Sequence, residues 1–206
     1  MNTQTKQTQD SLSPQDAFQL LVDGNKRFTQ NKFADRNLQQ QVTETSKGQY
    51  PFAVVLSCID SRVPAEIVFD QGIGDIFSAR VAGNIINEDM LGSMEYGCKV
   101  AGSKIIVVMG HTKCGAVTAA CNGVELGNIT PLLEKIKPAV TAVRQSKTQE
   151  SEMSSSSIEE VAITNVNMMI ENIRKESQIL HEMEKENKIK IVGAIYSVES
   201  GEVTFL

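Results

Sequence analysis

Two short apolar segments, each followed by a residue that can bind a metal ion, constrain this chain more than any other feature. Residues 52–57 (FAVVLS) precede Cys58, and residues 104–110 (KIIVVMG) precede His111. Runs of this length and composition are typical of strands buried on both faces of a parallel sheet. Because open α/β sheets bind ligands at the carboxyl ends of their strands, we predict that Cys58 and His111 meet at one edge of one sheet.

Cys114 completes a set of three candidate zinc ligands. It follows His111 by three residues and precedes an alanine-rich segment, residues 115–120, that is predicted to be helical. A helix N-terminus favours the thiolate, which is the form that binds zinc. Structural zinc sites usually have four Cys or His ligands, whereas catalytic sites keep one position for water. No fourth ligand of that kind lies near either segment, so Cys58, His111 and Cys114 predict an open, catalytic Zn²⁺ site, with one ion per chain.

The remaining cysteines and the second histidine have simpler interpretations. Cys98 and Cys121 lie in apolar, helical segments and are predicted to be buried free thiols, so no disulfide is required. His181 lies in a charged segment, residues 176–188, and is predicted to be on the surface of a helix. A histidine that shuttles protons to solvent is therefore not evident in this sequence.

The order of the other predicted elements indicates an α/β fold. Ser13 as an N-cap and Pro14 in the first turn predict the start of one helix. After a polar loop at residues 146–157, Ser157 and Glu160 fit a capping box that begins another helix. Further strands are predicted at residues 75–81, 189–198 and 203–206, and further helices at residues 91–101 and 129–144, the latter interrupted at Pro138. Strands that alternate with helices form a mostly parallel central sheet flanked by helices on both faces.

We expect a single domain over residues 13–206, preceded by a flexible polar tail over residues 1–12. The first helix has one apolar face, formed by Phe18, Leu21 and Val22. Such a face can pack on its own sheet or on a partner subunit, and we expect this amino-terminal helix to extend onto a partner.

The charge and hydropathy of the chain give no reason to expect a nucleic acid or a membrane as a partner. The net charge of −5 gives no reason to expect nucleic acid or an anionic membrane as a partner. No apolar stretch is long enough to span a bilayer, and residues 1–12 lack the apolar segment of a signal peptide. The expected location is cytoplasmic for the sequence as written, and periplasmic if a signal peptide has been removed.

The motifs resemble those of the β-class carbonic anhydrases, in particular bacterial members with an open active site. The C-x-D-x-R and H-x-x-C motifs of that family stand here as Cys58/Asp60/Arg62 and His111/Cys114. The similarity covers nearly the whole chain after about residue 13, including residues 69–72 (FDQG), 80–84 (RVAGN) and 92–96 (GSMEY). The RVAGN segment and the absence of tryptophan resemble the members whose site is always open.

The resemblance implies an activity, a substrate pocket and an assembly. Zinc-bound hydroxide would attack CO2 in a reversible hydration that yields bicarbonate and a proton. The small-molecule substrate, CO2 or bicarbonate, would be the principal partner, and the enzyme would be a homodimer or a homotetramer in which a neighbouring subunit contributes part of the pocket. By resemblance, the residues that line this substrate pocket are Gln49, Phe77, Ala82, Tyr96 and Gly115.

Asp60 and Arg62 are the candidate catalytic residues beside the zinc. A carboxylate at Asp60 can accept the hydrogen of the hydroxide and aim its lone pair at CO2, and Arg62 can hold that carboxylate in a bidentate ion pair. An ordinary ion pair at the end of a strand is the simpler interpretation, but the two residues flank a metal ligand. In some β-class enzymes the same aspartate instead binds zinc and closes the site. We expect Asp60 to be paired with Arg62.

Two other functions stay open at this point. A hydrolase acting on a CO2 analogue, such as carbonyl sulfide or carbon disulfide, would have the same zinc ligands and would differ in the shape of its pocket. A non-enzymatic structural or redox-sensing zinc module would also use these ligands, although Asp60 and Arg62 argue against it.

Overall fold

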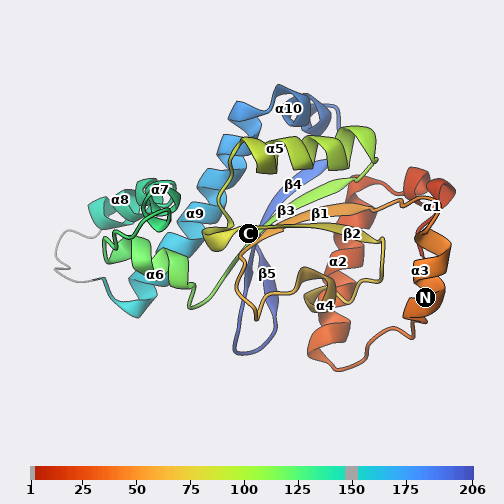
Figure 1. Cartoon of the computed structure of the whole chain (residues 1–206), viewed down its shortest axis with the longest axis horizontal. Coiled ribbons are helices and arrows are strands. Elements are labelled where there is room, and N and C mark those ends of the chain that lie inside the picture. Colours follow the sequence, from red (N-terminus) through yellow and green to blue (C-terminus); the bar gives the residue numbers. More distant parts are fainter. Residues whose placement is uncertain (1–2, 147–152) are drawn as a thin grey trace.

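A five-stranded sheet forms the centre of the protein (Figure 1). The structure is a computed structural model that describes residues 3–146 and 153–206. The strand order is β2-β1-β3-β4-β5. The first four strands of this order are parallel, and β5 pairs antiparallel with β4, which confirms the predicted mostly parallel sheet. The strands are β1 Ala53–Ser57, β2 Ile76–Arg80, β3 Ile105–His111, β4 Lys190–Tyr196 and β5 Val203–Phe205.

The two central strands are buried at every position because helices cover both faces of the sheet. Every residue of β1 and β3 is buried. Successive side chains in a strand point to opposite faces, so each strand contributes to both cores. Val54 and Leu56 belong to one apolar cluster, and Ala53 and Val55 to the other. This arrangement explains why both strands read as continuous apolar runs rather than as an alternating pattern.

The helices form one layer on each side of the sheet. Figure 1 shows α2 and α4 on one side and α5, α9 and α10 on the other. Among the residues that the structure describes, no helix is long and apolar enough to cross a membrane. The helical elements are α1 Lys6–Ser11, α2 Pro14–Thr29, α3 Leu38–Thr45, α4 Ala65–Val68, η1 Ala82–Asn84, α5 Glu88–Glu95, η2 Tyr96–Val100, α6 Gly115–Cys121, α7 Ile129–Glu134, α8 Lys137–Ser146, α9 Ser155–Glu176 and α10 Gln178–Lys185.

The amino-terminal segment differs from the predicted flexible tail. Residues 6–11 form α1, which begins with a capping box between Thr5 and Thr8. Gln9 is buried, and its amide donates to the carbonyl oxygens of Pro51 and Ala101 at 2.7 and 2.8 Å. Those two hydrogen bonds fix the segment on the body of the chain, a contact that local sequence does not indicate.

The helix after this segment begins where it was predicted, with Ser13 as the N-cap and Pro14 in the first turn. Its residues Ala17 and Leu21 are fully buried in the core on its own sheet. The apolar face therefore packs within the chain. The extension of this helix onto a partner subunit stays a prediction.

Most other element boundaries follow the sequence, with small shifts. The interruption predicted at Pro138 lies at residues 135–136, between α7 and α8, and Pro138 is in the first turn of α8. The helix predicted from residue 91 begins at Glu88.

The N-cap of α9 is Ser154, whose side chain accepts from the backbone N–H of Ser157, so the predicted cap at Ser157 is three residues too late. Several serines compete for this role, and local pattern did not choose between them. Within the loop predicted at residues 146–157, residues 147–152 lie outside the described part of the chain.

A buried cluster of charges fixes α2 and the loop after it to the loop that follows α4. Asp70 is 3% exposed and has a φ of 45°. Its carboxylate accepts from Arg27 Nε at 2.5 Å, from the backbone N–H of Ala34 at 3.1 Å, and from the Arg36 guanidinium. Burial by itself raises the pKa of Asp70, but the hydrogen bonds from the two arginines outweigh it and hold the pKa below its ordinary value. The ionised carboxylate therefore stabilises the fold at neutral pH.

We predict that Asp70→Asn lowers the free energy of unfolding by about 3 kcal/mol at pH 7, because it removes the charge that compensates a buried guanidinium. Since the pKa of Asp70 is depressed in the folded state, this difference should shrink as the pH falls through that lowered pKa. Denaturant unfolding at several pH values measures it. Asp10→Asn, in the exposed Lys6–Asp10 pair, is the matched control and should change little. Equal effects of the two substitutions on the free energy of unfolding would contradict the stabilising role of the ionised Asp70 carboxylate.

Candidate metal centre

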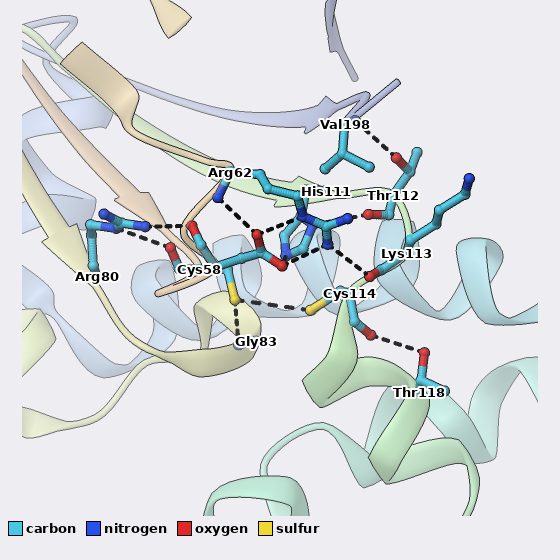
Figure 2. A network of polar contacts seen from close by, with 11 residues as sticks. Cys58, Arg62, Arg80, Gly83, His111, Thr112, Lys113, Cys114, Thr118 and Val198 are labelled. Carbon is cyan, nitrogen blue, oxygen red and sulfur yellow. Dashed lines mark hydrogen bonds and ion pairs between the residues drawn. The ribbon is translucent and has the colours of Figure 1, made fainter. Parts of the chain in front are cut away.

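The three predicted zinc ligands lie together at one edge of the sheet (Figure 2). Cys58 directly follows β1, His111 is the last residue of β3, and Cys114 is the N-cap of α6. Their ligand atoms all lie within 4.8 Å of one another. All three residues are buried, with exposures of 4%, 0% and 2%. The tertiary structure thus brings together two segments that are more than fifty residues apart in the sequence.

A tight turn after β3 aims Cys114 back at Cys58. Lys113 has a φ of 55°, in the left-handed region that residues other than glycine rarely adopt. The turn is anchored to the carboxyl end of β4 and the segment after it. The Thr112 N–H donates to the Tyr196 carbonyl at 3.0 Å, and the Thr112 hydroxyl accepts from the Val198 N–H at 3.1 Å. These contacts stabilise a backbone conformation that local sequence preference would disfavour.

The two sulfur atoms are close enough to share a proton. Cys58 Sγ and Cys114 Sγ are 4.0 Å apart. The Cys114 thiol lowers the pKa of Cys58 most, and the nearby His111 ring and backbone N–H groups of Asp60 and Gly83 lower it further, against the effect of burial. The pKa of Cys114 is raised by its contact with Cys58 and by burial. Each of the two thiols therefore changes the pKa of the other.

The donor set fits a zinc ion. His111 Nδ1 lies 2.9 Å from the Thr112 carbonyl oxygen, so Nδ1 carries the proton and Nε2 has its lone pair available. His111 Nε2 is buried and makes no hydrogen bond to the described residues. Two zinc–sulfur bonds of ~2.3 Å at a tetrahedral angle place the sulfur atoms about 3.8 Å apart, close to the separation seen here. Two thiolates and one imidazole are ligands that zinc prefers.

Asp60 borders the three ligands and is held by Arg62. Arg62 Nε donates to Asp60 Oδ1 at 2.9 Å, and one of its terminal nitrogens donates to Asp60 Oδ2 at 2.7 Å. The Arg62 guanidinium keeps the pKa of Asp60 well below its usual range. Asp60 Oδ2 lies 3.9 Å from His111 Nε2. An ionised carboxylate therefore borders the three candidate ligands.

Arg80 and Gly83 contact the site in ways that the sequence analysis missed. Arg80 Nε donates to the Cys58 carbonyl oxygen at 3.1 Å, and a terminal nitrogen donates to that of Asp60 at 2.6 Å. The Gly83 N–H donates to Cys58 Sγ at 3.4 Å. The segment RVAGN was noticed only through resemblance. The one signal that could have found these contacts is that Arg80 lies at the end of a predicted strand, β2, which neighbours β1.

The expected pocket residues fall into two groups. Ala82 is next to Gly83, and Gly115 directly follows Cys114 and is exposed, so both lie beside the metal centre. Phe77 and Tyr96 contact each other, with ring centroids 6.3 Å apart, and line a different pocket that includes Val54 and Met90. The lining of that pocket contains none of the three metal-binding residues.

Gln49, like Phe77 and Tyr96, lies away from the metal-site residues of its own chain. It is exposed and precedes β1, whereas Cys58 follows that strand. A five-residue strand spans roughly 17 Å, so the two residues lie at opposite ends of β1. Within one chain, Gln49 does not reach the metal centre.

The other cysteines and the second histidine lie where they were predicted. Cys98 and Cys121 are free and buried. Desolvation raises the pKa of Cys98 to about 12, so this thiol stays protonated and unreactive. His181 is exposed on α10.

Comparison with known proteins identifies close similarities over most of the chain. The family model described as carbonic anhydrase matches residues 53–203. The chain is 33% identical over 199 residues to carbonic anhydrase 2 of Mycobacterium tuberculosis, covering 93% of this chain and 92% of that protein. The solved β-carbonic anhydrase CcaA superimposes with a TM-score of 0.75 at 25% identity, over 91% of this chain and 94% of that one. A tetrameric β-carbonic anhydrase of Sordaria macrospora shares the fold, with a TM-score of 0.74 at 21% identity, over 92% and 96% of the two chains.

Proposed function

Because the chain belongs to the carbonic anhydrase family, in its β class, we propose that it catalyses the reversible hydration of CO2 to bicarbonate and a proton at a zinc ion held by Cys58, His111 and Cys114. The observation that supports this best is the position of Asp60. Its carboxylate is held by Arg62 at the border of three buried ligands. A purely structural zinc module has no need of such a group.

The zinc ligands and the Asp60–Arg62 pair, here called the dyad, have separate roles in this proposal. When bound, zinc lowers the pKa of a water molecule and so supplies a nucleophile near neutral pH. Asp60 Oδ2 would accept the remaining hydrogen of that nucleophile and so orient its lone pair toward CO2. Arg62 keeps Asp60 ionised and occupies both carboxylate oxygens. Because Asp60 is engaged in this way, it would leave the fourth metal position to water.

The first test is metal content together with CO2 hydration. Zinc-loaded wild-type protein should hold one ion per chain and hydrate CO2 in a stopped-flow assay, and His111→Ala should lose both properties because three ligands leave no substitute. His181→Ala, at an exposed histidine, is the matched control and should keep both. An active His111→Ala protein with a full complement of zinc would refute the ligand assignment. Turnover of carbonyl sulfide but not of CO2 would move the chain to the hydrolase alternative.

The second test separates the dyad from metal binding. Asp60→Asn should keep zinc but lower kcat by about 10²–10³-fold, which is the usual effect of removing one preorganised polar group from an active site. Arg62→Ala should act in the same direction, because Asp60 is then free to bind the metal. Glu171→Gln, which removes an exposed carboxylate paired with Arg174, controls for loss of a surface ion pair. Wild-type rates in both dyad variants would show that the pair is only structural.

We also propose that the chain assembles as a homodimer or homotetramer in which Gln49, Phe77 and Tyr96 serve the metal centre of a neighbouring copy. This is supported by the position of Gln49, at the far end of β1 from Cys58. It is also supported by the pocket that Phe77 and Tyr96 line, which contains none of the three ligands, and by the 54% exposure of Tyr96. Assembly of symmetric copies would bring an exposed pocket of one chain against the metal centre of another. The tetrameric relative from Sordaria macrospora shows that the fold is compatible with assembly.

Co-expression of two defective chains tests this arrangement. Gln49→Ala and His111→Ala should each be weakly active or inactive alone. A mixed dimer has one site with intact ligands from the first chain and an intact glutamine from the second, so about a quarter of wild-type activity should return in a random mixture. The control is Cys58→Ala with His111→Ala, in which no mixed dimer has a complete ligand set. If the first mixture recovers no more activity than the control, the shared pocket is wrong.

A further inference from the structure

One amide side chain lies in the middle of the apolar face of α9. Asn165 is 1% exposed and is surrounded along the helix by buried apolar residues, among them Val161, Ala162, Val166 and Met169. Its Oδ1 is buried and accepts no hydrogen bond from the described residues. An unpaired buried acceptor destabilises a folded protein, so packing alone does not explain an asparagine at this position.

The amide nitrogen of Asn165 has one specific partner. Nδ2 donates to the carbonyl oxygen of Gly83 at 3.0 Å, across 82 residues of sequence. Because a carbonyl can only accept, this contact also fixes which end of the amide faces Gly83. Gly83 in turn donates its N–H to Cys58 Sγ at 3.4 Å (Figure 2). A chain of two hydrogen bonds therefore connects α9 to a metal-binding sulfur.

The turn that contains Gly83 needs support from outside. Gly83 has a φ of 68° and Asn84 a φ of 41°, so two consecutive residues are in the left-handed region. A Cβ at Gly83 would lie 2.6 Å from Ile136 Cδ1, so no larger residue fits there without displacement. In this conformation the Gly83 N–H points at Cys58 Sγ. The hydrogen bond from Asn165 holds the same residue from its carbonyl side.

We propose that Asn165 is a positioning residue for the metal centre, which holds the Gly83 turn so that the Gly83 N–H stays directed at Cys58 Sγ. This inference rests on the proposed role of Cys58 as a metal ligand. An N–H that donates to a thiolate withdraws charge from the sulfur and fixes its direction. Groups that orient metal ligands in this way typically change metal affinity or activity by about 10–100-fold when they are removed.

Substitution at Asn165 tests the effect on the metal. Asn165→Leu keeps the branched shape of the side chain but cannot donate, and Asn167→Leu is the control on the exposed side of the same helix. We expect zinc competition with a chelator to show ~10–100-fold weaker binding in Asn165→Leu alone. In the cobalt-substituted protein, the sulfur-to-metal charge-transfer band should move to lower energy in this variant, because the sulfur regains charge. Zinc affinity and a band position equal to those of Asn167→Leu would overturn the proposal.

A measurement on the wild-type protein does not depend on how the variant folds. In protein loaded with ¹¹³Cd, the amide proton of Gly83 should show scalar coupling to the metal through the hydrogen bond to Cys58 Sγ. Absence of this coupling in the wild type would overturn the proposal, as would full coupling in a folded Asn165→Leu protein. If wild-type protein binds neither zinc nor cadmium, the proposed function itself fails. A normal metal centre that is insensitive to Asn165 contradicts only this inference.

Discussion

The parallel pairing of β1 with β3 is the constraint on which the metal centre depends. Ser57 pairs with Met109, so Cys58 and His111 leave the sheet at the same edge, one strand apart. A shift of the register by one residue would move Cys58 relative to His111 by ~3.3 Å along the sheet and would separate their donor atoms. The register is strongly specified because both strands are buried on both faces, where a slip would exchange every side chain between the two cores.

Around the candidate ligands, several polar contacts hold the backbone and the Asp60 carboxylate. Arg62 holds the Asp60 carboxylate, Arg80 from β2 holds the carbonyl groups of Cys58 and Asp60, and Thr112 anchors the turn to Cys114. These contacts are charge-assisted or directed at backbone groups, so they orient the site without using the sulfur atoms as acceptors.

The two groups of pocket residues show what a single chain lacks. Ala82 and Gly115 border the metal centre, whereas Gln49 lies at the opposite end of β1 and Tyr96 lines another pocket. The strand direction causes this separation, since residues before and after one strand cannot meet in the same sheet. For this reason the proposed function includes a second copy that completes the substrate pocket, so that assembly and activity are coupled in it.

The sequence by itself predicted the strands, the clustering of Cys58, His111 and Cys114, and the Asp60–Arg62 ion pair, all of which the structure contains. The signals were continuous apolar runs, candidate ligands at the carboxyl ends of two such runs, and side chains two positions apart. The sequence could not determine that residues 6–11 form a helix anchored by Gln9, nor that Ser154 rather than Ser157 caps α9. Only the tertiary structure showed that Arg80 holds the Cys58 carbonyl and that Asn165 reaches Gly83. Those contacts join residues 22 and 82 positions apart, and a hydrogen bond between distant segments leaves no periodic or local trace in the sequence.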